Sequence, residues 1–265
     1  MAITERIIVM ATDMVMKKKY KVASIICALA FIIFVLLCFI GVDKQAESII
    51  KPNLPEPVNP HPGQTEQSTS AAMYISPIDF DALQKKNPDI YGWLQIPGTD
   101  ISYAVLQSQK DDAFYLDHDE LGKYNVNGVL FSEHAYNKND FSDKVTAIYG
   151  HHLKSGAMFG NLQKYYTDDF DKYSKIVIYT PTEQIAYQVF AAVSFSNRHI
   201  MYYYDCFKEE LMMQEFLDDI NSVRAIGSYV DKSVEVSTKD QLLVLSTCLQ
   251  GDRTCRFLVI GKRID

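Results

Sequence analysis

Two cysteines and two arginines lie between apolar runs in residues 241–262, QLLVLSTCLQGDRTCRFLVIGK. The pattern predicts two strands joined by a polar loop, with Cys248 where the first strand ends and Arg253 and Arg256 where the second begins. A thiol beside guanidinium groups is a candidate nucleophile, because a nearby cation favours the thiolate form. A cysteine after an apolar run also fits a small buried core residue, so this segment alone leaves both interpretations open.

Two adjacent histidines, His151 and His152, follow a glycine at the end of another predicted strand, residues 145–149. We expect the glycine to let the backbone turn sharply and expose a histidine, whose titration lies near neutrality. A thiolate and an imidazolium together can carry acyl transfer, in which the thiolate attacks a carbonyl and the imidazolium protonates the leaving amine. The alternatives are a surface pair or half of a metal site, and zinc held by His151, Cys248 and Cys255 lacks the usual ligand spacing.

The elements that must position these residues are short strands at irregular spacing with few helices, a pattern that favours a closed barrel decorated by helices. Short helices are predicted after Ser76 and over Ala157–Tyr166, and a long one over Asp205–Val223, which is rich in Leu, Met and Glu.

Three separated motifs occur in the order found in a known family. The segment LSTC, followed by the arginine that opens the last strand, resembles the TLxTC…R motif of sortases, and YGH resembles the strand that carries their catalytic histidine. The segments DIYGWLQIPGT, YLDHDELGKYNVNGVLF and YGHHLKSGAMFGNL are similar to class B sortases in particular. The likeness covers Ser76–Arg263.

The resemblance implies a role for each site residue. Cys248 matches the nucleophile, His151 the general acid and base, and Arg256 the arginine that stabilises the oxyanion or substrate; Arg253 is the alternative for the last role. The candidate substrate-binding residues are Ser246, Thr247 and Tyr149.

Two positions depart from the family pattern. His152 stands where relatives often have Asn, so which ring is catalytic needs testing. Cys255, seven positions after Cys248, would allow reversible oxidation to a disulfide if the fold brought the two thiols within reach.

The fold that the resemblance implies is mainly β (α+β), a closed eight-stranded sortase-type barrel with an N-terminal helix and a long helix before the last two strands. The implied activity is that of a cysteine transpeptidase. Such an enzyme cleaves a C-terminal NPxTx- or LPxTG-like sorting motif after Thr and transfers the thioacyl group to an amine of a peptidoglycan precursor (lipid II) or a pilin lysine. This chemistry needs neither a metal nor an organic cofactor. A Cys–His peptidase and a non-catalytic module that binds zinc or haem remain as alternatives.

The N-terminal region predicts a membrane anchor. Residues 22–42 carry no charge and as a helix would span about 31 Å, enough for a bilayer core, with lysines crowded before them. The positive-inside rule places residues 1–21 in the cytoplasm and the rest of the chain outside. Residues 43–72 contain five of the nine prolines and are typical of an extended stalk, which leaves residues 73–265 as the catalytic domain.

Composition limits the class of partner. Of the net charge of −7, residues 1–42 contribute +3, so the remainder carries −10. An acidic body without a basic stripe argues against nucleic acid as a partner. With 48% hydrophobic residues, the chain can bury a sizeable core.

Overall fold

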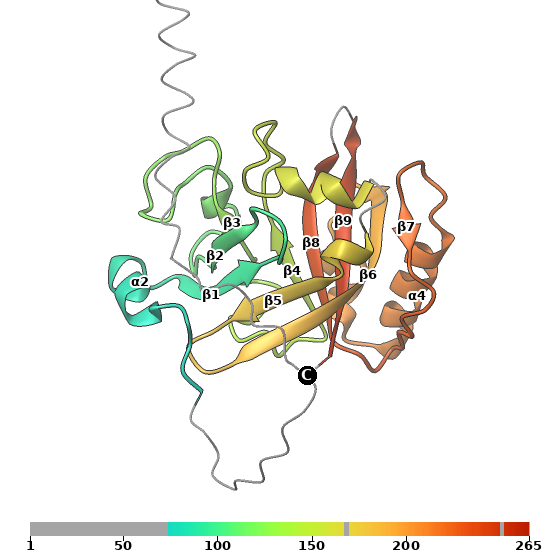
Figure 1. Cartoon of the computed structure of the whole chain (residues 1–265), viewed down its shortest axis with the longest axis horizontal. Coiled ribbons are helices and arrows are strands. Elements are labelled where there is room, and N and C mark those ends of the chain that lie inside the picture. The colour runs from blue at the N-terminus through green and yellow to red at the C-terminus, as the bar shows by residue number, and fades with distance from the viewer. Residues whose placement is uncertain (1–73, 167–169, 250–251, 265) are drawn as a thin grey trace, which may run out of the picture. The chain divides into compact units, whose positions relative to one another are not determined.

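The computed structural model describes residues 74–166, 170–249 and 252–264 (Figure 1). The predicted tail 1–21, anchor 22–42 and stalk 43–72 lie outside the described residues. Within the ranges that are described, no helix combines the length and the apolar character that crossing a bilayer requires.

The strands of the described region form one sheet that closes on itself. In chain order they are β1 Ile90–Gln95, β2 Ser102–Leu106, β3 Leu130–Phe131, β4 Val145–Tyr149, β5 Lys175–Tyr179, β6 Gln184–Ser196, β7 Tyr229–Val230, β8 Leu242–Leu249 and β9 Asp252–Arg263. Their order is β5-β1-β2-β3-β4-β8-β9-β6-β7, and β5 also pairs with β6. Eight strands therefore close the barrel, as predicted, and the two-residue β7 extends the sheet beyond β6.

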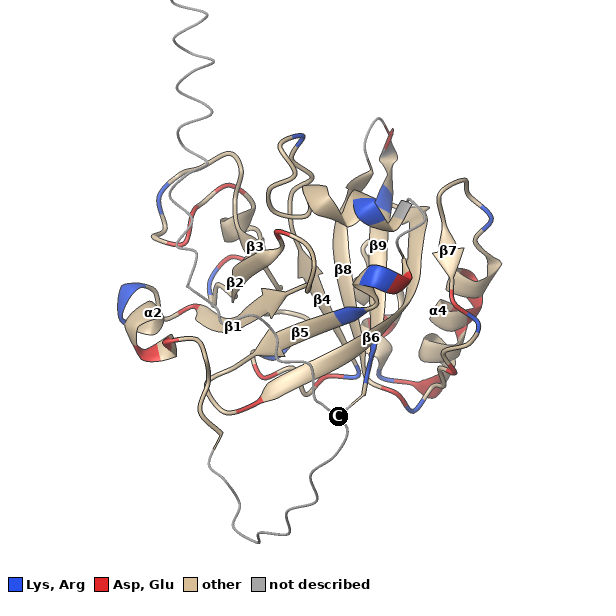
Figure 2. Cartoon of the chain, in the orientation of Figure 1, with Lys and Arg blue, Asp and Glu red and all other residues tan. Residues whose placement is uncertain are grey.

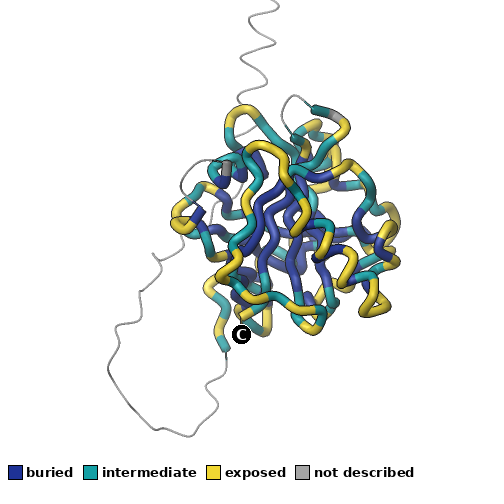
Figure 3. The backbone as a smooth tube through the Cα atoms, turned by 90° about the vertical axis from the view of Figure 1, so that its right-hand side faces the viewer, coloured by how far each residue is buried: buried dark blue, intermediate teal, exposed yellow. Residues whose placement is uncertain are grey.

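The central strands β4, β8 and β9 each contain a stretch that is buried on both faces, and in β8 and β9 this stretch includes the apolar runs Leu242–Leu245 and Phe257–Ile260 (Figure 3). Side chains alternate between the two faces of a strand, so Leu242 and Val244 share one face of β8, while Leu243 and Leu245 share the other. The first face packs against the helices outside the barrel, since Leu242 and Val244 share a cluster with residues of α3 and α4, so the second faces the barrel interior. Strands buried on both faces read as continuous apolar runs, which is why LLVL and FLVI stood out in the sequence.

The helices differ in detail from the predictions. They are α2 Phe80–Lys86, α3 Ile200–Tyr203 and α4 Glu210–Ser222, with short 3-10 helices η2 Phe114–Leu116, η3 Gly160–Tyr166, η4 Asp171–Tyr173 and η5 Asp205–Phe207. The N-terminal helix begins after Asp79, whose carboxylate accepts a hydrogen bond from the Ala82 amide, and not at Ser76. The helix predicted over Ala157–Tyr166 is a 3-10 helix that begins at Gly160.

The long helix predicted over Asp205–Val223 is interrupted near its start. Asp205, Cys206 and Phe207 all have positive φ, so the regular helix α4 begins only at Glu210. Phe207 is buried in the cluster between α4 and the barrel, where its ring stacks on that of Tyr204. Packing of the aromatic side chain therefore overrides the helical preference of this segment.

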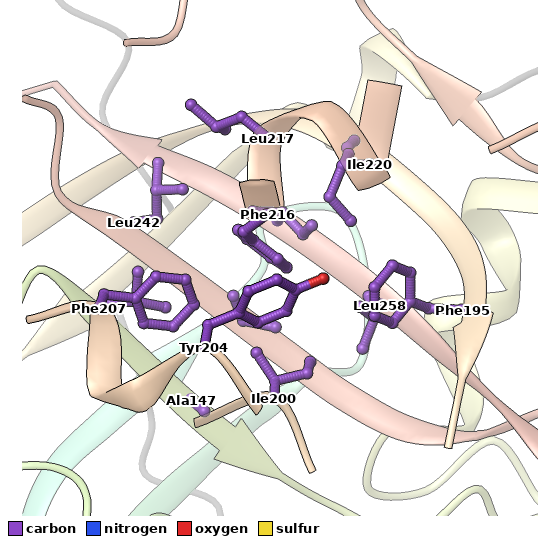
Figure 4. Packing of buried hydrophobic residues seen from close by; sticks show 14 of the residues in the cluster. Ala147, Phe195, Ile200, Tyr204, Phe207, Phe216, Leu217, Ile220, Leu242 and Leu258 are labelled. Carbon is purple, nitrogen blue, oxygen red and sulfur yellow. The ribbon is translucent and has the colours of Figure 1, made fainter. Parts of the chain in front are cut away.

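A layer of aromatic side chains joins α3 and α4 to the outer face of the barrel (Figure 4). Phe216 of α4 is fully buried, and its ring centroid lies 5.2 Å from that of Tyr204, 5.3 Å from that of Phe207 and 6.4 Å from that of Phe195. The opposite side of α4 is acidic, as Figure 2 shows, and presents no lysine or arginine.

Phe216→Ala is expected to lower the free energy of unfolding by about 3–5 kcal/mol, because truncating a fully buried phenylalanine removes apolar contacts and leaves a cavity. Urea denaturation followed by circular dichroism measures the change. Leu211→Ala, on the exposed side of the same helix, is the matched control and is expected to stay within about 0.5 kcal/mol of the wild type. Equal midpoints for the two variants would show that this layer does not hold the helices in place.

Candidate active site

Cys248 and Arg256 meet on neighbouring strands at one end of the barrel. Cys248 of β8 pairs with Arg256 of β9, and Nη1 of the guanidinium donates a hydrogen bond to Sγ at 2.6 Å. Cys248 is exposed, whereas Leu242 to Thr247 before it are buried. The interpretation of Cys248 as a buried core residue is therefore wrong, and a positive charge lies against an accessible sulfur.

His151 lies at the same end of the next strand. β4 and β8 run parallel, with Tyr149 opposite Ser246, and the Gly150 amide continues the ladder by donating to the Ser246 carbonyl. His151 and Cys248 each follow the Tyr149–Ser246 pair by two residues, so alternation places them on the same face of adjacent strands, which are spaced about 4.8 Å apart. This alternation puts His151, two residues beyond the end of β4, in one row with Cys248 of β8 and Arg256 of β9.

The His151 ring is oriented by a backbone carbonyl. Its Nε2 lies 2.7 Å from the oxygen of Leu116, at the end of η2. A carbonyl oxygen only accepts hydrogen bonds, so Nε2 carries a proton. In the neutral ring Nδ1 then has the free lone pair and is the nitrogen that can take up or release a proton.

Gly150 is required for close packing. A Cβ atom at this position would lie 2.4 Å from Cδ2 of Leu130 and 2.7 Å from Cδ2 of Phe159. Its φ angle is outside the left-handed region, so the expected sharp turn is not the reason for glycine here. The missing side chain lets β4 continue straight to His151 beneath these two residues.

His152 points away from the row that contains Cys248. Nε2 of Gln163 donates a hydrogen bond to Nε2 of His152 at 3.0 Å, so His152 carries its proton on Nδ1 when neutral. Burial lowers the pKa of His152 below its usual value. The second histidine is therefore tied to η3, and a neutral ring is favoured there.

The three predicted substrate-binding residues occupy different environments. Ser246 lies on the same face as Cys248 but is only 4% exposed. Thr247 faces the barrel interior, and its buried Oγ1 has no hydrogen-bond partner among the described atoms. Tyr149 lies beside the site; burial first and then the Glu133 carboxylate raise the pKa of its hydroxyl, while Arg256 opposes the shift.

Cys255 does not approach Cys248 from the same side. It adjoins Arg256 in β9 and pairs with Ser196 of β6, so its side chain points to the face opposite Arg256. Both thiols are free, as is that of Cys206. Reversible oxidation of Cys248 and Cys255 to a disulfide therefore stays a prediction. Arg253, the alternative to Arg256, lies in the same strand, but its side chain is outside the described part.

The zinc alternative finds no ligand set in the described part of the chain. His, Cys, Asp and Glu side chains gather there in no group of three or more that could hold a metal ion. His151, Cys248 and Cys255 in particular are divided between two faces of the sheet.

One set of residues near the site escaped the sequence analysis. Nε2 of His199 lies 2.8 Å from Oε2 of Glu133, and the His199 ring packs against Tyr136 and Tyr149, with centroids 4.7 and 6.1 Å away. Glu133 and His199 are 66 positions apart, so no spacing rule links them. The only local signal was a histidine just before an apolar aromatic run, IMYYY.

The comparison with known proteins follows this geometry. A sequence model described as the sortase domain matches residues 94–264. The chain belongs to the sortase family. Sortase B of Listeria monocytogenes is 35% identical over 172 residues, and sortase B of Staphylococcus aureus is 30% identical over 188 residues. The aligned regions cover 63% and 70% of this chain, and 65% and 74% of those proteins, so just under two thirds of the Listeria protein is spanned.

The fold agrees with the same class. A solved structure of an S. aureus sortase B–substrate complex superposes with a TM-score of 0.61 and 29% identity, over 70% of this chain and 84% of that one. The predicted resemblance to class B sortases is confirmed, and so is the predicted sortase-type barrel. Membership of the sortase family supports the interpretation of Cys248, His151 and Arg256 as candidate catalytic residues.

Proposed function

We propose that this class B sortase is a cysteine transpeptidase that cleaves an NPxTx- or LPxTG-like sorting motif after Thr and passes the acyl group to an amine. The contact between Arg256 Nη1 and Cys248 Sγ carries the proposal, because it places a cation against the one exposed thiol of the row. The proposed acceptor is an amine of a peptidoglycan precursor or a pilin lysine. The proposed location is the outer face of the membrane, with residues 22–42 as the anchor.

The first half of the reaction forms a thioacyl enzyme. The Cys248 thiolate attacks the threonine carbonyl carbon, and the negative charge that develops on the carbonyl oxygen is stabilised by the Arg256 guanidinium. His151 then gives its Nδ1 proton to the nitrogen of the leaving amine, and the peptide bond breaks. Nε2 keeps its hydrogen bond to the Leu116 carbonyl, so the ring holds its orientation during proton transfer.

The second half reverses these roles. An incoming amine attacks the thioacyl carbonyl, Nδ1 of His151 removes the proton that the amine loses, and the Cys248 thiolate leaves. The thiolate returns to its place beside Arg256, and a new amide bond has replaced the old one. The protein's own residues account for every proton that moves.

Mass spectrometry of products from NPxTx and LPxTG peptides, with and without an added amine such as triglycine or lysine, tests this function. A transpeptidase gives a threonine-linked amide that depends on the added amine. A Cys–His peptidase gives only the free acid whatever the amine concentration, and that result would replace the proposal. Peptides left intact under all conditions would also contradict it.

A further inference from the structure

The segment that leaves β6 beside the catalytic row is held by an unusual histidine. Phe195 of β6 pairs with Arg256, and α3 begins five residues later at Ile200. The buried side of α3 packs onto β4, where Ile200 and Met201 join the cluster that contains Ala147 (Figure 4). Its outer side presents two exposed tyrosines, Tyr202 and Tyr203, which are 76% and 53% exposed.

His199 is the N-cap of α3 and uses both ring nitrogens. Nδ1 accepts a hydrogen bond from the Tyr202 amide at 3.1 Å, and Nε2 lies 2.8 Å from the Glu133 carboxylate. A carboxylate accepts and an amide N–H donates, so the neutral ring with its proton on Nε2 satisfies both partners. The same ring packs on Tyr149, two residues before His151. His199 thereby links α3 to β3, β4 and the catalytic row.

Protonation of His199 breaks one of its two hydrogen bonds and strengthens the other. The second proton must go to Nδ1, where it faces the Tyr202 N–H and removes the acceptor that caps α3. The bond to Glu133 becomes an ion pair and is strengthened. The groups that act on the ring from the elements packed around it are Glu133, Asp112, Tyr136, Tyr149 and Tyr202, with Arg198 next in sequence.

Arg198 holds the other side of this segment and does not depend on His199. Its Nη2 donates to the Asp219 carboxylate of α4 at 2.5 Å and to the Tyr204 hydroxyl at 2.9 Å. The end of α3 therefore stays attached to α4 when the N-cap is lost. The change expected on protonation is confined to the first turn of α3, at Tyr202.

We propose that His199 is a positioning residue that couples α3 to pH: the neutral ring caps α3 and sets its tyrosines beside the site, and the protonated ring releases that turn. This inference rests on the proposed function only for its effect on substrate. The pKa of His199 is raised above its ordinary value of 6.5, chiefly by the hydrogen bond to Glu133, so the transition falls near or above pH 6.5.

The effect on global stability has the opposite sign. Because the folded-state pKa is raised, the Glu133–His199 pair adds to the free energy of unfolding fully below pH 6.5, and this contribution is lost as the pH rises through the folded-state value. Acid conditions therefore release the first turn of α3 without unfolding the domain. A general loss of structure cannot produce the same signature.

The first experiment measures by NMR the hydrogen-exchange rate of the Tyr202 amide in the full chain. At each pH, the rate in the wild type is divided by the rate in His199→Asn. Asparagine is a good N-cap that does not titrate, so it keeps an acceptor at all pH values. The ratio is expected to rise about fivefold as His199 becomes protonated, which is the change that loss of one typical N-cap produces. A ratio that stays constant across the titration of His199 would overturn the proposal.

The second experiment measures KM and kcat for a sorting peptide over the same pH range. Relative to His199→Asn, the wild-type KM is expected to rise several-fold on acidification while the ratio of kcat values stays level. Glu133→Gln keeps an acceptor for Nε2 but removes the charge, so its transition is expected at lower pH than in the wild type. Coincident KM profiles, or an unshifted transition in Glu133→Gln, would refute the coupling. If no peptide is cleaved, the proposed function fails, and the exchange of Tyr202 still decides the role of His199.

Discussion

Cys248→Ala is expected to abolish both cleavage of the sorting peptide and formation of the thioacyl enzyme, while leaving the fold intact. The sulfur accepts a hydrogen bond from Arg256, and a methyl group cannot replace it as a nucleophile. The side chain is exposed, so its truncation leaves no buried cavity and is expected to change the free energy of unfolding by less than about 0.5 kcal/mol. Intact-protein mass spectrometry after incubation with peptide detects the adduct directly.

Cys255→Ala provides the matched control for this variant. It removes an identical group seven positions later, on the face of β9 that points away from Cys248. Its activity is expected to stay within about twofold of the wild type, because its thiol contacts neither the nucleophile nor Arg256. Cleavage that is retained in Cys248→Ala, or lost in Cys255→Ala, would contradict the assignment of Cys248 as the nucleophile.

Much of the barrel could be predicted because its strands are strongly patterned. The apolar runs in β8 and β9 are continuous since both faces of these stretches are buried; the run in β8 ends at Ser246, and the run in β9 begins directly after Arg256. What local pattern does not encode is the pairing of β4 with β8, whose partners Val145 and Leu242 are far apart in the sequence. The position of the row of His151, Cys248 and Arg256 depends on that pairing, so the resemblance to sortases was needed to predict it.

The helical predictions failed where tertiary packing competes with local preference. Residues 205–223 are rich in helix formers, yet the burial of Phe207 against Tyr204 and Phe216 forces a left-handed turn before α4. His199 escaped detection for a related reason. Its partner Glu133 is 66 positions away, two residues beyond the end of β3, and reaches His199 only in the folded chain.

The two adjacent histidines can be separated by one matched pair of substitutions. His151→Gln is expected to lower kcat/KM for peptide cleavage by about 10²–10⁴, the usual contribution of a general acid or base. Glutamine can still donate to the Leu116 carbonyl from the position of Nε2, but it has no group that exchanges a proton where Nδ1 lies. The loss therefore measures proton transfer rather than a displaced loop.

His152→Gln is expected to cost less than about threefold. Its ring is bonded to Gln163, it faces away from Cys248, and burial lowers its pKa, so a neutral ring is favoured near neutral pH and has no proton to spare for a leaving amine. Steady-state kinetics of both variants, with urea denaturation to confirm that they fold, decide the assignment. A larger loss in His152→Gln than in His151→Gln would move the acid and base to the second histidine. It would also require that ring to turn toward β8 when substrate binds, because the alternation of side chains along the chain places only His151 on the face of Cys248.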